Sequence, residues 1–299
     1  MKHVLKVGLI VAAATVVLSF SAHAKQHNDT LSKIMDAGEI SLGHRDVSVP
    51  FSYLDSTQKP VGFAMDLCGE VVKAVATKLE MPSLRVRLEP VQLGNQIELI
   101  RDGTIDIVCG PTSNTLERQG VVAFSNTIFV SSIRAVVRAS SRIETFEDMA
   151  DKRVSLTAAS TSIDLLRARE RARVFQTEKE IYPDHSTAFL ALVSGKTDAF
   201  VMDDVLLSGL VANSLSPGKW RIIDDDLRVE PYGLVLPKND ASFKALVDET
   251  LRALNENGDF ETLYNKWFMS PIPPKGVNLN LPMSAPLKDA LAHPNDRGV

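Results

Sequence analysis

Two stretches of the chain repeat one short pattern, and they decide the fold that we expect: IRDGTIDIVCG at residues 100–110 and LVSGKTDAFVMDD at residues 192–204. In each stretch a helix-like pattern stops at a glycine, Gly103 or Gly195, and an apolar run follows an aspartate, Asp106 or Asp198. Both aspartates precede their strands, away from the carboxyl ends where open α/β sheets bind ligands, so we expect turn or capping roles for them. The repeat predicts two related α/β units.

Helical and strand patterns alternate around both corners. Apolar residues recur at helical spacing over 62–80, and they alternate with polar residues over 84–90. The alternation restarts near Glu144 and ends in two helical patterns separated at Asn257 and Gly258. This order of elements predicts an α/β fold with largely parallel sheets.

The composition is that of a globular protein, since 44% of the 299 residues are hydrophobic and 23% are charged. The length suits one large or two medium domains. The formal net charge of −4 and the lack of a basic cluster in the sequence argue against a nucleic-acid surface. We therefore expect no nucleic-acid partner.

The first 24 residues have the features of a secretory signal peptide. Two lysines lie in MKHVLK, an apolar run of fourteen residues follows, and Ala22-His23-Ala24 has the small-x-small pattern of a cleavage site. A membrane anchor is the alternative, but the run is shorter than the roughly 20 residues that span a bilayer. We expect cleavage after Ala24 and a mature protein that is soluble and exported.

The chain has two cysteines, Cys68 and Cys109. In an oxidising compartment such a pair is typical of a disulfide, which would stabilise the fold by roughly 4 kcal/mol. Two buried free thiols are the alternative, since free cysteine is often buried. Two cysteines without supporting histidines make a poor zinc site, so we expect no bound metal.

Polar side chains follow the first repeated strand directly, in GPTSNTLERQ at residues 110–119. Backbone amides, hydroxyl groups and the Arg118 guanidinium would converge there, which suits a carboxylate held by two hydrogen bonds. A capped surface helix with a solvated arginine is the alternative. In the second unit, residues 160–162 open a helix, and Asp203 and Asp204 end the second repeated strand. Neighbouring strand residues point to opposite faces, so one of these carboxylates can face a cleft and pair with an ammonium group.

An arginine in one unit and a carboxylate in the other would suit a zwitterionic ligand. His44 and Arg45 end the first strand, and His185 lies in a loop, where a histidine is more often structural than catalytic. The sequence has no GxSxG elbow, no HExxH, no phosphate-binding glycine loop and no dinucleotide fingerprint. These absences remove the common routes to catalysis, and we expect neither a cofactor nor an enzyme.

Several motifs occur in the order found in one protein family: GHRDVSVPFSY, GFAMDLC, CGPTSNTLERQ, FSNTIFV, VMDDVLL, KWFMSPIPPKGVNLN and HPNDRGV. Across the mature chain the sequence resembles the periplasmic glutamate/aspartate-binding proteins of ABC importers, in the polar amino-acid-binding family of extracellular solute-binding proteins. The resemblance implies a type II periplasmic-binding-protein fold, with two lobes, two hinge strands and a ligand cleft between the lobes. It implies a first lobe at 25–130 plus 232–299, a second lobe at 138–230, and hinge segments at about 131–137 and 231.

The resemblance also implies roles for single residues in holding an amino acid. Arg118 would bind the ligand α-carboxylate, helped by Ser113 and by Thr161 from the second lobe. Asp203, the first residue of the aspartate pair, would bind the α-ammonium group.

The positions that face the ligand side chain depart from the family pattern. The resemblance implies that Arg45 reaches this side chain and that His185 lines the site. However, Leu93 and Gln96 stand where the family has a serine and an arginine, and Pro111 replaces a serine. Glutamine supplies no charge, although its amide can donate to a carboxylate or to an amide. We therefore expect a ligand of the glutamate/aspartate class, with the preference shifted toward glutamine, asparagine or another polar amino acid.

A non-enzymatic binding protein is the leading hypothesis: a monomer that captures an amino acid, closes by a hinge motion and delivers it to an ABC permease. The alternative is a periplasmic dehydratase-type enzyme on the same fold, since His185 and Asp203 could perform acid–base chemistry. A ligand-binding sensor subunit is a third hypothesis, and it would share the same residues.

Overall fold

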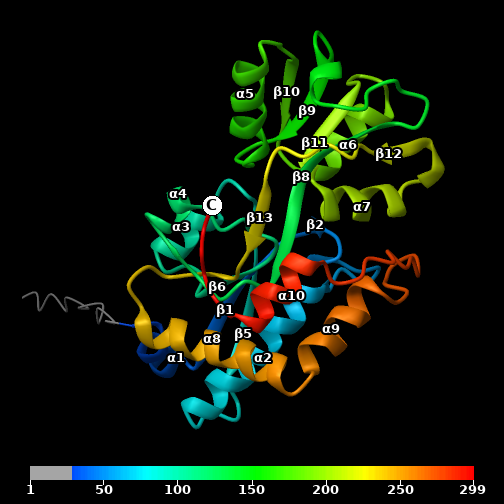
Figure 1. Cartoon of the computed structure of the whole chain (residues 1–299). Helices are drawn as coiled ribbons and strands as arrows, with labels where there is room; N and C mark the ends of the chain where they lie inside the picture. The colour runs from blue at the N-terminus through cyan, green and yellow to red at the C-terminus, as the bar shows by residue number, and fades with distance from the viewer. Residues whose placement is uncertain (1–28) are drawn as a thin grey trace, which may run out of the picture.

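The computed structural model describes residues 29–299, which form two α/β units joined by the strands β8 and β13 (Figure 1). The predicted signal peptide, residues 1–24, lies outside the described residues. Within the described part of the chain, no helix is long and apolar enough to cross a membrane.

The first unit contains a sheet with the strand order β5-β1-β6-β14-β7 and a small sheet with the order β2-β3-β4. Its strands are β1 (Glu39–His44), β2 (Val47–Ser48), β3 (Ser52–Leu54), β4 (Pro60–Val61), β5 (Arg85–Pro90), β6 (Ile107–Cys109), β7 (Ala123–Phe124) and β14 (Val235–Leu236). Its helices are α1 (Thr30–Ala37), α2 (Phe63–Lys78), α3 (Gln96–Arg101), α4 (Leu116–Gln119), α8 (Ala241–Glu256), α9 (Asp259–Phe268) and α10 (Ala285–Ala292).

The second unit contains a sheet with the strand order β10-β9-β11-β8-β12, and β13 pairs with β8 off this path. Its strands are β8 (Phe129–Arg138), β9 (Arg153–Thr157), β10 (Glu178–Tyr182), β11 (Ala199–Asp203), β12 (Trp220–Ile222) and β13 (Val229–Tyr232). Its helices are α5 (Ser162–Arg173), α6 (His185–Val193), α7 (Asp204–Asn213) and the short 3-10 helices η1 (Glu147–Met149) and η2 (Pro217–Lys219).

The expected α/β fold is confirmed, but its sheets are mixed rather than largely parallel. β1 pairs in parallel with β5 and β6, and β9 pairs in parallel with β10 and β11. β8 carries the chain into the second unit, where it runs antiparallel to β11 and β12, and β13 returns antiparallel to β8. β14 follows this return and therefore runs antiparallel to β6.

Both repeated corners are present, and their aspartates have the expected capping role. Gly103 and Gly195 each adopt a left-handed backbone with φ of +77°, which glycine tolerates better than other residues. An Asp106 carboxylate oxygen accepts a hydrogen bond from the backbone N–H of Ser41 on β1 at 2.8 Å. Asp198 likewise accepts from the N–H that begins β9, at 3.1 Å. Each aspartate therefore joins the start of its strand to the neighbouring strand, at the edge of the sheet opposite to the carboxyl ends of the parallel strands.

The core of the first unit explains why its elements form. Along α2, Phe63, Leu67, Val71 and Val75 are fully buried, and their spacing of four residues gives the helix one apolar face. Aromatic rings from α2, the 51–53 segment, β8, β13 and α9 pack together in edge-to-face and stacked pairs. Because this cluster includes the start of β8 and the end of β13, the strands that join the two units are anchored in the first unit.

Candidate functional site

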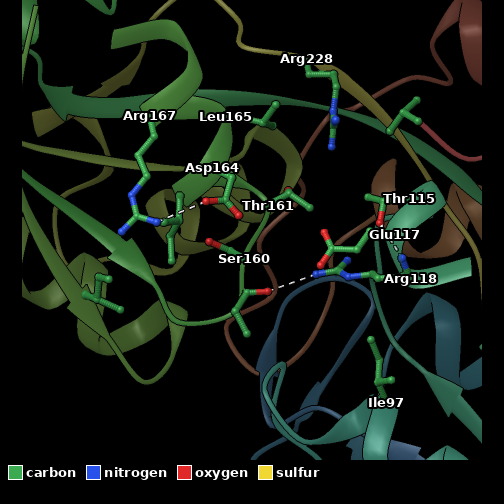
Figure 2. Close-up of a pocket in the computed structure, with 14 residues that line it drawn as sticks. Ile97, Thr115, Glu117, Arg118, Ser160, Thr161, Asp164, Leu165, Arg167 and Arg228 are labelled. Atoms are coloured by element: carbon green, nitrogen blue, oxygen red, sulfur yellow. Dashed lines mark hydrogen bonds and ion pairs between the residues drawn. The ribbon is translucent and has the colours of Figure 1, made fainter. Parts of the chain in front are cut away.

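A small cavity of about 10 Å³ lies between the two units, and most of the residues expected to bind ligand line it. The first unit supplies Leu93, Pro111, Ser113 and Arg118, and the second unit supplies Ser160, Thr161, His185, Met202, Asp203 and Leu206. A wider, more open pocket of about 620 Å³ adjoins this cavity and shares Arg118, Ser160 and Thr161 with it (Figure 2).

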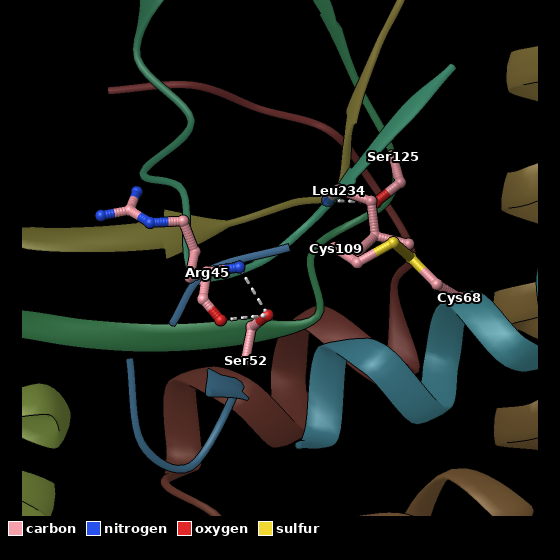
Figure 3. Close-up of a disulfide and its surroundings, with 6 residues drawn as sticks. All are labelled: Arg45, Ser52, Cys68, Cys109, Ser125 and Leu234. Carbon is pink, nitrogen blue, oxygen red and sulfur yellow. Dashed lines mark hydrogen bonds between the residues drawn. A yellow bond between two sulfur atoms is a disulfide. The ribbon is translucent and has the colours of Figure 1, made fainter. Parts of the chain in front are cut away.

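The loop that carries Ser113 and Arg118 begins where β6 ends. Cys109, the last residue of β6, forms a disulfide with Cys68 of α2 (Figure 3), which confirms the predicted pair. At the other end of the loop, Thr115 caps α4, and its side chain accepts a hydrogen bond from the Arg118 N–H. The loop is therefore fixed at both ends.

The Arg118 guanidinium spans the two units. Its Nη1 donates to the carbonyl oxygen of Ser113 at 2.9 Å. Its Nη2 donates to the carbonyl oxygen of Ala159 in the second unit at 3.1 Å, the dashed line that starts at Arg118 in Figure 2. Burial lowers the pKa of Arg118, and the charges of Glu230 and Asp203 oppose this change. Since a guanidinium has five N–H groups, Arg118 retains donors for an anionic group in the cavity.

The N-terminus of α5 faces Arg118 across the cavity. Thr161 precedes this helix, and its hydroxyl donates to the Glu230 carboxylate of β13 at 2.9 Å. The buried hydroxyl oxygen of Ser162 has no hydrogen-bond partner within residues 29–299. The positive end of the helix dipole and its free N–H groups favour a negatively charged group at this place.

Asp203 ends β11 and is only 3% exposed. Burial, and next the negative charge of Glu230, raise the pKa of Asp203 to about 7. The neighbouring Tyr232 hydroxyl opposes this rise in the pKa, and Oδ1 of Asp203 has no hydrogen-bond partner in the described chain. An uncompensated buried carboxyl group of this kind suits an ammonium partner.

Asp204 has a different role from its neighbour. Its carboxylate accepts hydrogen bonds from the Ser131 hydroxyl at 2.6 Å and from the Ser132 N–H at 3.2 Å, both on β8. It also accepts from the N–H of Val205 in the first turn of α7. As expected for adjacent strand residues, only one carboxylate of the pair lines the cavity.

Arg45 is buried beside the cavity, although it is not among the residues that line it. Its backbone N–H donates to the Ser52 hydroxyl at 2.9 Å (Figure 3), while its guanidinium makes no hydrogen bond or ion pair within residues 29–299. Burial lowers the pKa of Arg45 to about 10, Asp46 opposes this, and the positive charge of Arg118 lowers it further. Arg45 therefore stays charged at neutral pH while only 4% exposed, which favours an acidic ligand group nearby.

His185 is the first residue of α6 and is 2% exposed. Its Nδ1 lies 2.9 Å from the Thr157 hydroxyl oxygen at the end of β9. Burial, helped by the charge of Arg45, lowers the pKa of His185 to about 3. The ring is therefore neutral at physiological pH, and it can present one N–H donor or one acceptor to the cavity.

Leu93 and Gln96 are the two positions at which a departure from the family pattern was expected. Leu93 lines the cavity, whereas Gln96, at the start of α3, is fully buried and is not among the residues that line it. The Gln96 Oε1 accepts from the Thr112 hydroxyl at 3.3 Å, and its Nε2 has no partner within the described residues. Both N–H donors of this amide are therefore unused within the described residues.

Sequence reasoning did not identify Glu230, Thr157 and Tyr232, which contact or surround the expected binding residues. Glu230 is fully buried, and it accepts hydrogen bonds from both Thr161 and Arg228. The signal available in the sequence was that Glu230 is a charged residue within the short apolar segment that leads back to the first unit. Within the described part of the chain, no group of three or more potential metal ligands occurs.

Comparisons with known proteins find relatives that match nearly the whole chain. The chain is 39% identical over 295 residues to the glutamate/aspartate import solute-binding protein of Escherichia coli K12, covering 96% of this chain and 98% of that protein. It is 40% identical over 292 residues to the L-glutamate/L-aspartate-binding protein of Pseudomonas aeruginosa, covering 97% of each.

The fold is shared more widely. The structure of an ABC uptake transporter substrate binding protein from Streptococcus pneumoniae with bound histidine superposes with a TM-score of 0.73 at 23% identity, covering 81% of this chain and 97% of that one. The fold is accordingly that of the type II periplasmic amino-acid-binding proteins. Residues 40–270 match the model of one family, and the chain belongs to the bacterial extracellular solute-binding proteins, family 3.

Proposed function

We propose that this protein captures one amino acid with an acidic or polar side chain in the periplasm and delivers it to an ABC permease. One observation carries the proposal: Arg118 and Asp203, of opposite charge, line one cavity from different units. Their opposite charges on two walls would suit the two ends of a zwitterion. The names of the two relatives, which bind glutamate and aspartate, support the same class of ligand.

The charges in the site favour an acidic ligand side chain. The α-carboxylate and α-ammonium groups of the ligand would neutralise Arg118 and Asp203, which leaves the Arg45 guanidinium buried without a partner. A second carboxylate would remove that penalty, and an amide would offset it only in part. Neutral His185 would add a hydrogen bond to either group. Glutamate or aspartate is therefore the first ligand that we propose.

The side-chain end of the site carries less positive charge than an arginine at position 96 would give. Gln96 can donate to a carboxylate or to an amide with similar ease, and Leu93 offers no hydrogen bond. We therefore retain the prediction that discrimination against glutamine and asparagine is weak, and that the preference is shifted toward these amides.

The two units would be the lobes of a hinged clamp. We propose a first lobe at 25–130 plus 232–299 and a second lobe at 138–230, with hinge segments at about 131–137 and 231. The pairing of β8 with β13 supports this, because these strands are the covalent connections between the units. Closure over the ligand would produce the form that the permease recognises. Residues 1–24 would direct export and be removed, and the mature protein would act as a monomer.

Isothermal titration calorimetry of the mature protein with glutamate, aspartate, glutamine and asparagine tests the proposal. We expect tight binding of at least one of the four, with the ligand recovered unchanged. Arg118→Ala should weaken this binding about tenfold to a hundredfold, because a charge-assisted hydrogen bond contributes roughly 1.5–3 kcal/mol. Arg171→Ala, which changes an exposed arginine of α5, is the matched control and should bind as wild type.

Two results would reject the proposal. Folded protein that binds none of the four amino acids would show that the ligand class is wrong. Recovery of a chemically changed product would favour the dehydratase-type enzyme. A sensor role would be distinguished by ligand-dependent binding to a receptor without uptake of the amino acid by cells.

A further inference from the structure

Helix α7 leads from the candidate site to the opposite unit. It begins directly after Asp203, and Leu206 in its first turns lines the cavity. Residues three and four positions further along a helix lie on the same face, so Gly209 and Leu210 follow Leu206 on the side toward the first unit. The same helix therefore contacts the ligand cavity at one end and the first unit further along.

Gly209 meets the first unit at a place where no side chain fits. A methyl group added at Gly209 would lie 2.5 Å from the carbonyl oxygen of Val49 and 3.2 Å from its carbonyl carbon. Real side chains do not approach backbone atoms this closely, and backbone atoms cannot rotate away. Val49 lies between β2 and β3, and Gly209 is buried against it.

Other contacts between the units surround the cavity. Beyond Gly209, the Lys275 ammonium donates to the carbonyl oxygen of Asn213 at the end of α7, at 2.5 Å. At the entrance of the cavity, Arg118 donates to the Ala159 carbonyl. The two units thus touch at the entrance and along α7, with the small cavity between these contacts.

We propose that Gly209 is a positioning residue for ligand capture: its missing side chain lets α7 dock on Val49 when the two units close around the amino acid. This inference rests on the proposed function, since it requires that ligand binding and closure are coupled. A larger residue at position 209 would hold the units apart. It would weaken ligand binding without touching any group that contacts the ligand.

The helical position of Gly209 supports a specific role. Glycine in the middle of a helix is less favourable than alanine, both in backbone entropy and in helix propensity. Substitution by alanine should therefore stabilise an isolated helix. Alanine at position 209 would disturb the contact with Val49, because the atoms closest to the added methyl group are the Val49 backbone and Cβ.

A pair of glycine-to-alanine variants tests the inference. Gly209→Ala introduces the clash, and Gly69→Ala is the matched control, because Gly69 lies inside α2 with no heavy atom within 4 Å of an added methyl group. Glutamate binding by calorimetry, thermal melting without ligand, and the radius of gyration with and without saturating glutamate would be measured for wild type and both variants.

We expect both variants to melt, without ligand, at or above the wild-type temperature. Gly209→Ala should raise the Kd for glutamate at least about tenfold, because the binding-competent closed state becomes less populated. With saturating glutamate, the radius of gyration of Gly209→Ala should decrease less from its ligand-free value than that of the wild-type protein. Gly69→Ala should bind and contract as wild type does.

Three outcomes overturn the inference. If Gly209→Ala binds and contracts as wild type does, the contact does not control closure. If Gly209→Ala fails to fold or melts far below wild type without ligand, the contact is permanent packing of the fold. If the wild-type protein neither binds glutamate nor contracts, the proposed function fails and this inference fails with it. If the wild-type protein binds glutamate and Gly209→Ala behaves in the same way, only this inference is rejected.

Discussion

Ligand affinity should fall as the pH is lowered from 8 to 5, because the ligand ammonium group must replace a proton on Asp203. Burial first, and the charge of Glu230 second, raise the pKa of Asp203 to about 7 in the ligand-free protein. An ammonium partner would favour the carboxylate and lower this pKa in the complex. Binding below pH 7 therefore requires the release of a proton from Asp203. Each further unit by which the pH is lowered makes the binding free energy less favourable.

The size of the effect follows from this pKa. With a value of about 7, roughly nine-tenths of Asp203 is ionised at pH 8, and only about one part in a hundred at pH 5. The Kd should thus rise by on the order of a hundredfold over this range, equivalent to about 2.7 kcal/mol. The pKa of His185, lowered to about 3, keeps that ring neutral throughout, so it adds nothing to the slope.

The same shift has the opposite sign for the stability of the ligand-free protein. A raised carboxyl pKa means that the folded state binds more protons than the unfolded state between about pH 4 and pH 7. The stability contribution of Asp203 is therefore present at low pH and is lost as the pH rises through about 7. Ligand-induced stabilisation should grow over the same interval.

Titration calorimetry with glutamate at pH 5, 6, 7 and 8, in buffers of different ionisation enthalpy, would measure both the Kd and the protons released. We expect nearly one proton released at pH 5 and almost none at pH 8. Asp203→Asn should bind weakly and lose the pH dependence, whereas Asp204→Asn should keep it. A Kd that stays constant from pH 5 to 8, or an unchanged slope in Asp203→Asn, would refute the reasoning.

Three further predictions concern the side-chain end of the site and the disulfide. Thr157→Val should weaken glutamate binding by about 0.5–1.5 kcal/mol in calorimetry, because His185 loses the hydroxyl that holds its ring, and Thr157→Ser should restore it. Gln96→Arg should increase the preference for glutamate over glutamine by about 1.5–3 kcal/mol, and equal gains for both ligands would contradict this. Replacing Cys68 and Cys109 by serine should lower the free energy of unfolding by about 2–4 kcal/mol in urea denaturation, and an unchanged midpoint would count against it.

Much of the local structure followed from short sequence patterns. The glycines that end the repeated helices, and the buried face of α2, depend on spacings within a few residues of one another. Asp106 and Asp198 were expected to cap, and each accepts a backbone hydrogen bond from the next strand. The mixed pairing of the sheets was missed, since it depends on where the chain crosses between the units.

The candidate site was only partly predictable. Arg118 and Asp203 could be placed at the ends of strands, and the family resemblance extended this to the other expected residues. Glu230 was missed, because a single charged residue in a short apolar segment does not by itself show what it contacts. Its contact with Thr161 joins residues 69 positions apart in the chain.

The sequence by itself determined most of the elements, the family and the kinds of side chain available for a zwitterion. These depend on local spacing and on residue chemistry, which the linear order of residues records directly. Only the tertiary structure decided that Asp203 is buried beside Glu230, that the Arg45 guanidinium has no partner in residues 29–299, and that Gly209 lies against Val49. These properties depend on how two separately formed units pack, and packing sets burial, pKa and closure through atoms that are far apart in the chain.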